Sequence, residues 1–210
     1  MPLRSLYPED DDEGIRATLR AAFNRLKELE EFCSVRDELY CSTVEGGSEP
    51  AVWSSWPRLR RLALYNPDVS SAEFMDGLQR CQNLTHLVLT RADGLREPLP
   101  YDPSNIRQLP PLKRVVIINS DGTDQSNIAL QLPLGHRGFL SQLWLSRQVR
   151  TAESVNEATE SEPLFVYHSV PVPPDRSGDD IELCQDWVRE HVLDGTLWDV
   201  SGIPFPAIET

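Results

Sequence analysis

A short apolar pattern recurs three times in the middle of this chain of 210 residues. Residues 59–66 read Leu-Arg-Arg-Leu-Ala-Leu-Tyr-Asn, residues 84–91 read Leu-Thr-His-Leu-Val-Leu-Thr-Arg, and residues 112–119 read Leu-Lys-Arg-Val-Val-Ile-Ile-Asn. The second copy begins 25 residues after the first, and the third begins 28 residues after the second. The last two apolar positions of each copy are two residues apart, which places their side chains on one face of a β-strand. The pattern therefore predicts three short strands in the same register.

An L-x-x-L-x-L core that recurs every 20–29 residues or so is typical of leucine-rich repeats. Between the first two copies, Ser70–Glu73 form an S-x-x-E capping box that predicts the start of a helix. Gly77 costs that helix about 1 kcal/mol relative to alanine. Three prolines between residues 98 and 103 leave room for only a helical turn in the next interval. We therefore expect an α/β fold: a short, irregular leucine-rich-repeat-like unit with a mostly parallel sheet and flanking helices.

The segments on either side of the repeats have patterns of their own. Apolar residues at helical spacing from Ile15 to Cys33 predict an amphipathic helix of about five turns. Leu164–His168 is typical of a strand, and Asp179–Glu182 is the acidic start of a terminal helix that Gly195 caps. We expect an acidic disordered N-terminus at 1–13, an amphipathic helix at 14–41, a linker at 42–52, a leucine-rich-repeat-like domain at 53–200 with a polar insertion near 151–162, and a tail at 201–210.

The formal net charge of −13 is distributed unevenly along the chain. Basic and acidic side chains number 6 and 12 in residues 1–50, 12 and 8 in residues 51–150, and 2 and 13 in residues 151–210. The basic side chains of the middle segment can pair with acidic side chains of this chain, bind an acidic partner, or be solvated. The acidic surplus argues against binding to nucleic acid. The chain has no apolar run of about 18 residues and no signal-peptide core, so we expect no membrane association and an intracellular protein, cytoplasmic or nuclear.

The residues that commonly bind metals are scattered. The four cysteines contain no C-x-x-C pair, and the four histidines contain no H-x-x-x-H pair. Zinc sites require such clustering, so we expect neither a metal nor another cofactor. The cysteines fit small core residues in a reducing compartment.

One segment is similar to a catalytic motif. Val115–Thr123 reads as a buried strand followed by Asn-Ser-Asp-Gly-Thr, which resembles the D-x-D-G-T motif of haloacid-dehalogenase-type phosphatases. In that family the first aspartate is the nucleophile, whereas the amide of Asn119 cannot attack phosphorus as a carboxylate does. We favour a repeat strand followed by an Asp-Gly turn. A divergent phosphatase that uses Asp121 is the alternative.

Two parts of the chain resemble a family of interaction proteins. Trp56–Asn66 and Leu87–Leu95, together with Ile181–Val188 and Gly195–Trp198, resemble the C-terminal region of fungal F-box/leucine-rich-repeat-like proteins. The resemblance covers roughly residues 53–200. In that family an N-terminal F-box docks onto the adaptor of a cullin-type ubiquitin ligase, and the repeat region recruits the target.

The resemblance implies a non-catalytic protein–protein interaction module, the substrate-recruiting region of an F-box-type receptor, with an unidentified protein partner. No leucine–proline signature precedes the repeats, so a ligase adaptor is expected only if the F-box is divergent. A remnant without an F-box and without a ligase role is a further alternative.

The strand register also predicts a surface. One face of the sheet should hold the repeat leucines, and the opposite face should present three rows of side chains. These rows are Arg61, His86 and Arg114, then Ala63, Val88 and Val116, then Tyr65, Thr90 and Ile118. The last two rows are largely apolar, and an exposed apolar patch usually marks an interface. We therefore take this face as the candidate partner surface. The alternative is that the helix expected from Ile15 to Cys33 covers it.

Overall fold

The computed structural model of the protein describes residues 11, 14–39, 41–44, 49–95, 97, 99, 109–120, 138–153, 165–173 and 179–204. The α-helices in this part of the chain are α1 (Ile15–Phe23), α2 (Ala72–Arg80), α4 (Phe139–Glu153) and α5 (Asp180–Leu193). Two short 3-10 helices are η3 (Val52–Ser55) and η5 (Leu197–Asp199). The strands are β1 (Glu31–Cys33), β2 (Arg61–Tyr65), β3 (His86–Thr90), β4 (Arg114–Ser120), β5 (Phe165–Val170) and β6 (Ile203–Pro204).

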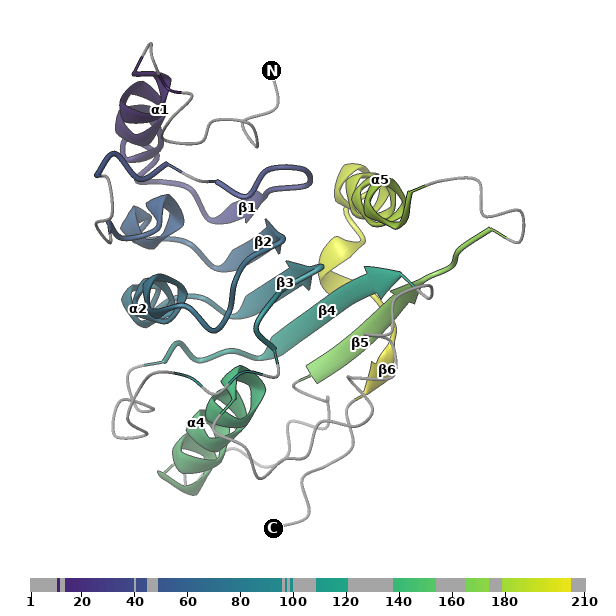
Figure 1. Ribbon diagram of the computed structural model, residues 1–210. Coiled ribbons are helices and arrows are strands. Elements are labelled where there is room, and N and C mark those ends of the chain that lie inside the picture. The colour runs from purple at the N-terminus through teal and green to yellow at the C-terminus, as the bar shows by residue number, and fades with distance from the viewer. Residues whose placement is uncertain are drawn as a thin grey trace.

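The strands form one sheet whose spatial order is the order of the sequence, from β1 to β6 (Figure 1). Strands β1 to β5 are parallel, and β6 is antiparallel to β5. The predicted register is confirmed, because Leu62 pairs with Leu87 and Leu87 pairs with Val115. The protein is thus an α/β protein with a mostly parallel sheet, as expected.

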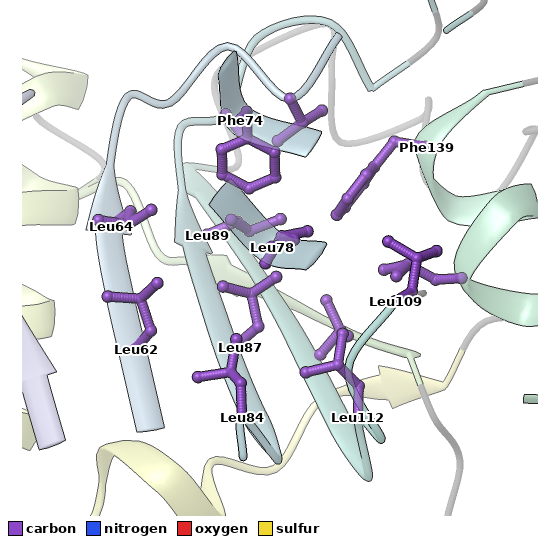
Figure 2. Close-up of a cluster of buried hydrophobic side chains, with 14 of the residues drawn as sticks. Leu62, Leu64, Phe74, Leu78, Leu84, Leu87, Leu89, Leu109, Leu112 and Phe139 are labelled. Carbon is purple, nitrogen blue, oxygen red and sulfur yellow. The ribbon is translucent and has the colours of Figure 1, made fainter. Parts of the chain in front are cut away.

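The repeat leucines form the larger of two hydrophobic clusters, on the face that η3, α2 and α4 cover. Figure 2 shows the leucines of β2 and β3 pointing towards Phe74 and Leu78 of α2 and towards Phe139 of α4. The first leucine of each copy lies at the entry to its strand, and Leu59 and Leu84 are completely buried. Each such leucine contributes about 1.5–3 kcal/mol by leaving water.

The C-terminal segment covers the other face of the sheet (Figure 1). The predicted start of α5 is confirmed, because the Asp179 carboxylate accepts a hydrogen bond from the Ile181 N–H at 2.9 Å. Its predicted end is confirmed as well. Gly195 has a φ of 78°, and the Thr196 N–H donates to the His191 carbonyl at 2.9 Å, as in a Schellman cap. Helices therefore pack on both faces of the sheet.

The amphipathic helix expected at 14–41 is wrong beyond Phe23. The chain turns there, and Glu31–Cys33 instead forms strand β1 beside β2. The rings of Phe23 and Phe32 lie 6.2 Å apart, and both pack on Trp56. In a continuous helix two residues nine apart would lie about 13.5 Å from each other along the axis. The shared contact with Trp56 therefore requires the reversal.

Other expected boundaries also move. The linker at 42–52 ends within the fold, because Val52 is 2% exposed and begins η3. Helix α4, which the sequence pattern did not predict, extends into the polar insertion expected near 151–162, and residues 154–162 lie outside the described residues. The expected tail at 201–210 contributes β6 to the sheet. The N-terminal segment 1–13 lies outside the described residues, apart from residue 11.

Candidate interaction surface

The apolar rows that were expected to bind a partner are buried. Ala63, Val88 and Val116 are each 1% exposed, and Ile118 is completely buried. Tyr65 and Thr90 are buried as well. The prediction of an open face is therefore wrong, and so is the predicted cover, because α5 and η5 lie on this face instead of the N-terminal helix.

The basic row is half-buried beneath the C-terminal segment. The Arg114 guanidinium donates a hydrogen bond to the Val200 carbonyl at 2.6 Å. The Arg61 guanidinium carbon lies 5.8 Å from the ring centroid of Trp198, within the range of a cation–π contact. Burial lowers the pKa of His86, and the positive charge of Arg61 lowers it further. The chain's own C-terminal segment thus contacts the basic row. Contact within the chain was one of the alternatives left open by the charge distribution.

A cavity of about 250 Å³ lies beside this row, where the C-terminal end of α5 approaches β1. The cavity is lined by Glu31, Phe32, Cys33, Arg61, His191, Val192, Gly195, Leu197 and Trp198. Small-molecule sites usually enclose about 300–1,000 Å³. This cavity is smaller, and it fits one side chain of a partner better than a whole ligand.

Three ion pairs connect the β1 segment with the β2 segment, and in each pair the arginine lies 30 positions after the glutamate. Glutamate oxygens and arginine nitrogens lie 2.6 Å apart in Glu28–Arg58, 4.0 Å apart in Glu30–Arg60, and 3.0 Å apart in Glu31–Arg61. The glutamate side chains are 76%, 52% and 52% exposed, respectively. Exposed pairs of this kind contribute only about 0–1 kcal/mol each. Their main consequence is a group of exposed carboxylates at the start of the outer strand, of which Glu31 lies within β1.

This part of the site could have been found in the sequence. Leu29 and Phe32 stand where the first repeat has Leu59 and Leu62, and Phe32 pairs with Leu62 in the sheet. The segment is therefore a degenerate copy of the repeat, 30 residues before the first recognised one. Ser34 stands where the first repeat has its last leucine, Leu64. The neighbouring apolar residues have a helical spacing, which made this copy of the repeat difficult to recognise.

The described residues offer little for nucleophilic or metal chemistry. Burial raises the pKa of Cys33 and Cys81 to about 12 and that of Cys184 to about 11. These thiols stay protonated at neutral pH and are poor nucleophiles. In the same residues no group of three or more histidine, cysteine or acidic side chains is placed to hold a metal ion. None of the helices described is both long and apolar enough to cross a membrane.

The phosphatase-like segment ends strand β4. The Asn119 side-chain oxygen accepts a hydrogen bond from the Ser120 N–H at 3.0 Å, and Asn119 is 4% exposed. Asp121 lies outside the described residues. Open α/β enzymes bind ligands in the crevice where strand order reverses. The order of the parallel strands described here runs from β1 to β5 without a reversal, so the sheet provides no crevice of that type.

No protein-family model, curated protein or solved structure matches this chain.

Proposed function

We propose that this protein is a non-catalytic protein-interaction module with a leucine-rich-repeat-like architecture. The observation that carries the proposal is the in-register pairing of β2, β3 and β4, whose L-x-x-L-x-L side chains occupy equivalent buried places. Stacking of this kind builds an extended scaffold that presents surface without enclosing an active-site crevice.

Within this proposal, the module is the target-recruiting part of an F-box-type ubiquitin-ligase receptor. The support is the resemblance of the repeat segments and of the terminal helix to that family. The face that a solenoid commonly uses for binding is covered here by α5 and η5. Recruitment would therefore use the edges of the sheet and the surface around the C-terminal end of α5.

Affinity purification of the tagged full chain from a fungal lysate, followed by quantitative mass spectrometry, tests the proposal. Val88→Asp, which disrupts the core under α5, serves as the folding-defective control. We expect a protein that the wild type enriches and the control does not, and that binds the purified chain directly in calorimetry. Co-purification of a ligase adaptor and a cullin would support the ligase role. Recovery of a specific partner without the adaptor and cullin would indicate an interaction module that acts without a ligase adaptor. Failure to find any direct binding partner would contradict the proposal.

The enzymatic alternative has its own test. Hydrolysis of p-nitrophenyl phosphate by the purified chain, dependent on Mg²⁺ and abolished in Asp121→Asn, would replace the binding proposal with a phosphatase. We expect no activity above that of the Asp121→Asn variant.

A further inference from the structure

We infer that β1 is a docking edge for a basic, extended segment of a partner protein. The segment pairs with β1 as an added strand and inserts one apolar side chain into the cavity beside Trp198. This inference rests on the proposed binding function and names its surface and its class of partner.

The first argument is the backbone of β1. β1 lies at one end of the described sheet, and no other strand in that part of the chain pairs with its outer side. The Glu30 carbonyl accepts hydrogen bonds from β2, and the Ser34 N–H donates to the Ala63 carbonyl. Because these directions alternate along a strand, the N–H and C=O groups of Glu31 and Cys33 face away from β2. Such an edge is a template for strand addition by an extended peptide.

The second argument is the position of the cavity. Glu31 pairs with Arg61 and Cys33 pairs with Ala63, so the side chains of Glu31 and Cys33 lie on the face of the sheet that α5 covers. Both Glu31 and Cys33 line the cavity. A strand added beside β1 continues these rows, so every second side chain of the partner points towards this face. A side chain placed next to Cys33 therefore reaches the cavity, with Val192 on its other side.

The apolar surface extends beyond the cavity. Val192 is 37% exposed and Leu193 is 74% exposed, and they follow each other at the end of α5. Val192 lines the cavity and Leu193 follows it in sequence, and an exposed apolar surface at a small cavity favours a partner with an apolar anchor, because such anchors carry most of the affinity of an interface.

The third argument is charge. Glu31 of β1 pairs with Arg61 of β2 and is still 52% exposed, and just before β1 Glu28 and Glu30 pair with Arg58 and Arg60 in the same way. Lysine or arginine on an added strand would repeat this arrangement on the outer side, since opposite charges on neighbouring strands are stabilising. A second copy of this chain that offered its own β1 in a register centred on Glu31 would place glutamate against glutamate, which is unfavourable. The partner segment therefore carries a basic residue opposite Glu31 and an apolar residue two positions away, opposite Cys33.

Fluorescence anisotropy with a labelled peptide tests the inference. The probe is the blocked octapeptide Ser-Lys-Thr-Leu-Thr-Lys-Thr-Ser, in which each lysine lies two positions from the leucine and on the same face of the strand. One control peptide replaces its lysines with glutamate, and another replaces its leucine with serine. We expect saturable binding of the probe, and binding at least about tenfold weaker for both controls, since each lacks one of the two recognised features. Equal binding of the serine peptide would mean charge attraction alone and would overturn the docking edge.

Variants of β1 separate strand addition from other modes of binding. Glu31→Pro removes an N–H that faces away from β2, so it leaves the pairing with β2 intact. Glu31→Ala removes the carboxylate and keeps the N–H. We expect Glu31→Pro to weaken binding more than Glu31→Ala does, and Glu182→Lys, an exposed change of charge elsewhere, to have no effect. Circular-dichroism melts within a few degrees of the wild type would verify that each variant is folded. Equal affinity of the alanine and proline variants would refute strand addition.

Three further measurements complete the test. Bound peptide should slow amide hydrogen exchange at Glu31 and Cys33, and unchanged exchange there would contradict the inference. A concentration-dependent dimer that Glu31→Pro abolishes would assign the edge to a second copy and overturn the proposed partner. If a partner protein found by affinity purification binds Glu31→Pro as tightly as wild type, the docking edge is wrong and the module function still stands.

Discussion

The substitution Val88→Asp probes the packing of the C-terminal segment on the sheet. Val88 is 1% exposed and lies at the centre of β3, in a cluster with Cys184 and Val188 of α5. An aspartate at this position would bring a carboxylate between the sheet and the helix. The neighbouring residues of the row, Ala63 and Val116, offer it no hydrogen-bond donor in their side chains.

The expected loss of stability follows from two contributions. Removing a buried valine costs about 1.5 kcal/mol, at the lower end of the range for large apolar side chains. Burying a polar group without a partner costs at least about 2 kcal/mol more. The sum of at least about 3.5 kcal/mol is a large part of the 5–15 kcal/mol that stabilises a typical domain. For a chain of this size about 1 kcal/mol corresponds to 2–4 °C, so the Tm should fall by at least about 7–14 °C.

A thermal melt followed by circular dichroism measures this loss. The matched control is Val44→Asp, the same chemical change at a valine that is 51% exposed, and it should leave the Tm within about 2 °C of wild type, as is usual for surface substitutions. If Val88→Asp melted together with Val44→Asp, α5 would not cover this face in solution. The apolar rows would then again be a candidate partner surface.

Three further outcomes are expected from packing and charge. Gly77→Ala should lower the Tm despite the gain of about 1 kcal/mol in helix propensity, because the added Cβ would lie 2.5 Å from the Trp53 ring, and overpacking costs about 1–3 kcal/mol. Burial and the charge of Arg61 lower the pKa of His86 below 6.5, so the unfolded state binds the proton first as the pH falls. The free energy of unfolding in urea should therefore decrease below about pH 6.5, and His86→Gln should flatten that part of the profile. Burial raises the pKa of all four cysteines, so a thiol-specific disulfide reagent at pH 8 should label the native protein slowly and the denatured protein rapidly.

The repeat pattern was sufficient to predict the centre of the fold. Leucines at the same positions of each copy have to lie on one buried face, so the pairing of β2, β3 and β4 followed from the spacing alone. The start and end of α5 followed from local chemistry, the Asp179 cap and the left-handed Gly195. These predictions depend on neighbouring residues and on a single period, which is why they succeeded.

The edge of the sheet was predicted as a helix, because its degenerate copy of the repeat keeps only Leu29 and Phe32 of the apolar positions. Apolar residues from Ile15 to Cys33 keep a helical spacing, and the shared contact of Phe23 and Phe32 with Trp56 shows that the chain reverses between them. The backbone N–H and C=O groups of β1 can form hydrogen bonds either with β2 or within a helix. The contact with Trp56 therefore decides between a strand and a helix. The cavity likewise depends on how the end of α5 is placed against β1, which involves residues more than 150 positions apart.

The identity of the buried face could, in contrast, have been decided by combining two observations in the sequence. A parallel strand that is apolar on both faces needs a cover on each of them, and β2, β3 and β4 are apolar on both. The chain ends in a helix with an apolar stripe, containing Cys184 and Val188, that needs a surface of its own to cover. Because the two requirements satisfy each other, the apolar rows belong to the core. A partner can then reach the sheet only at its ends, and at one of these ends lie the exposed Glu31 and the cavity beside β1.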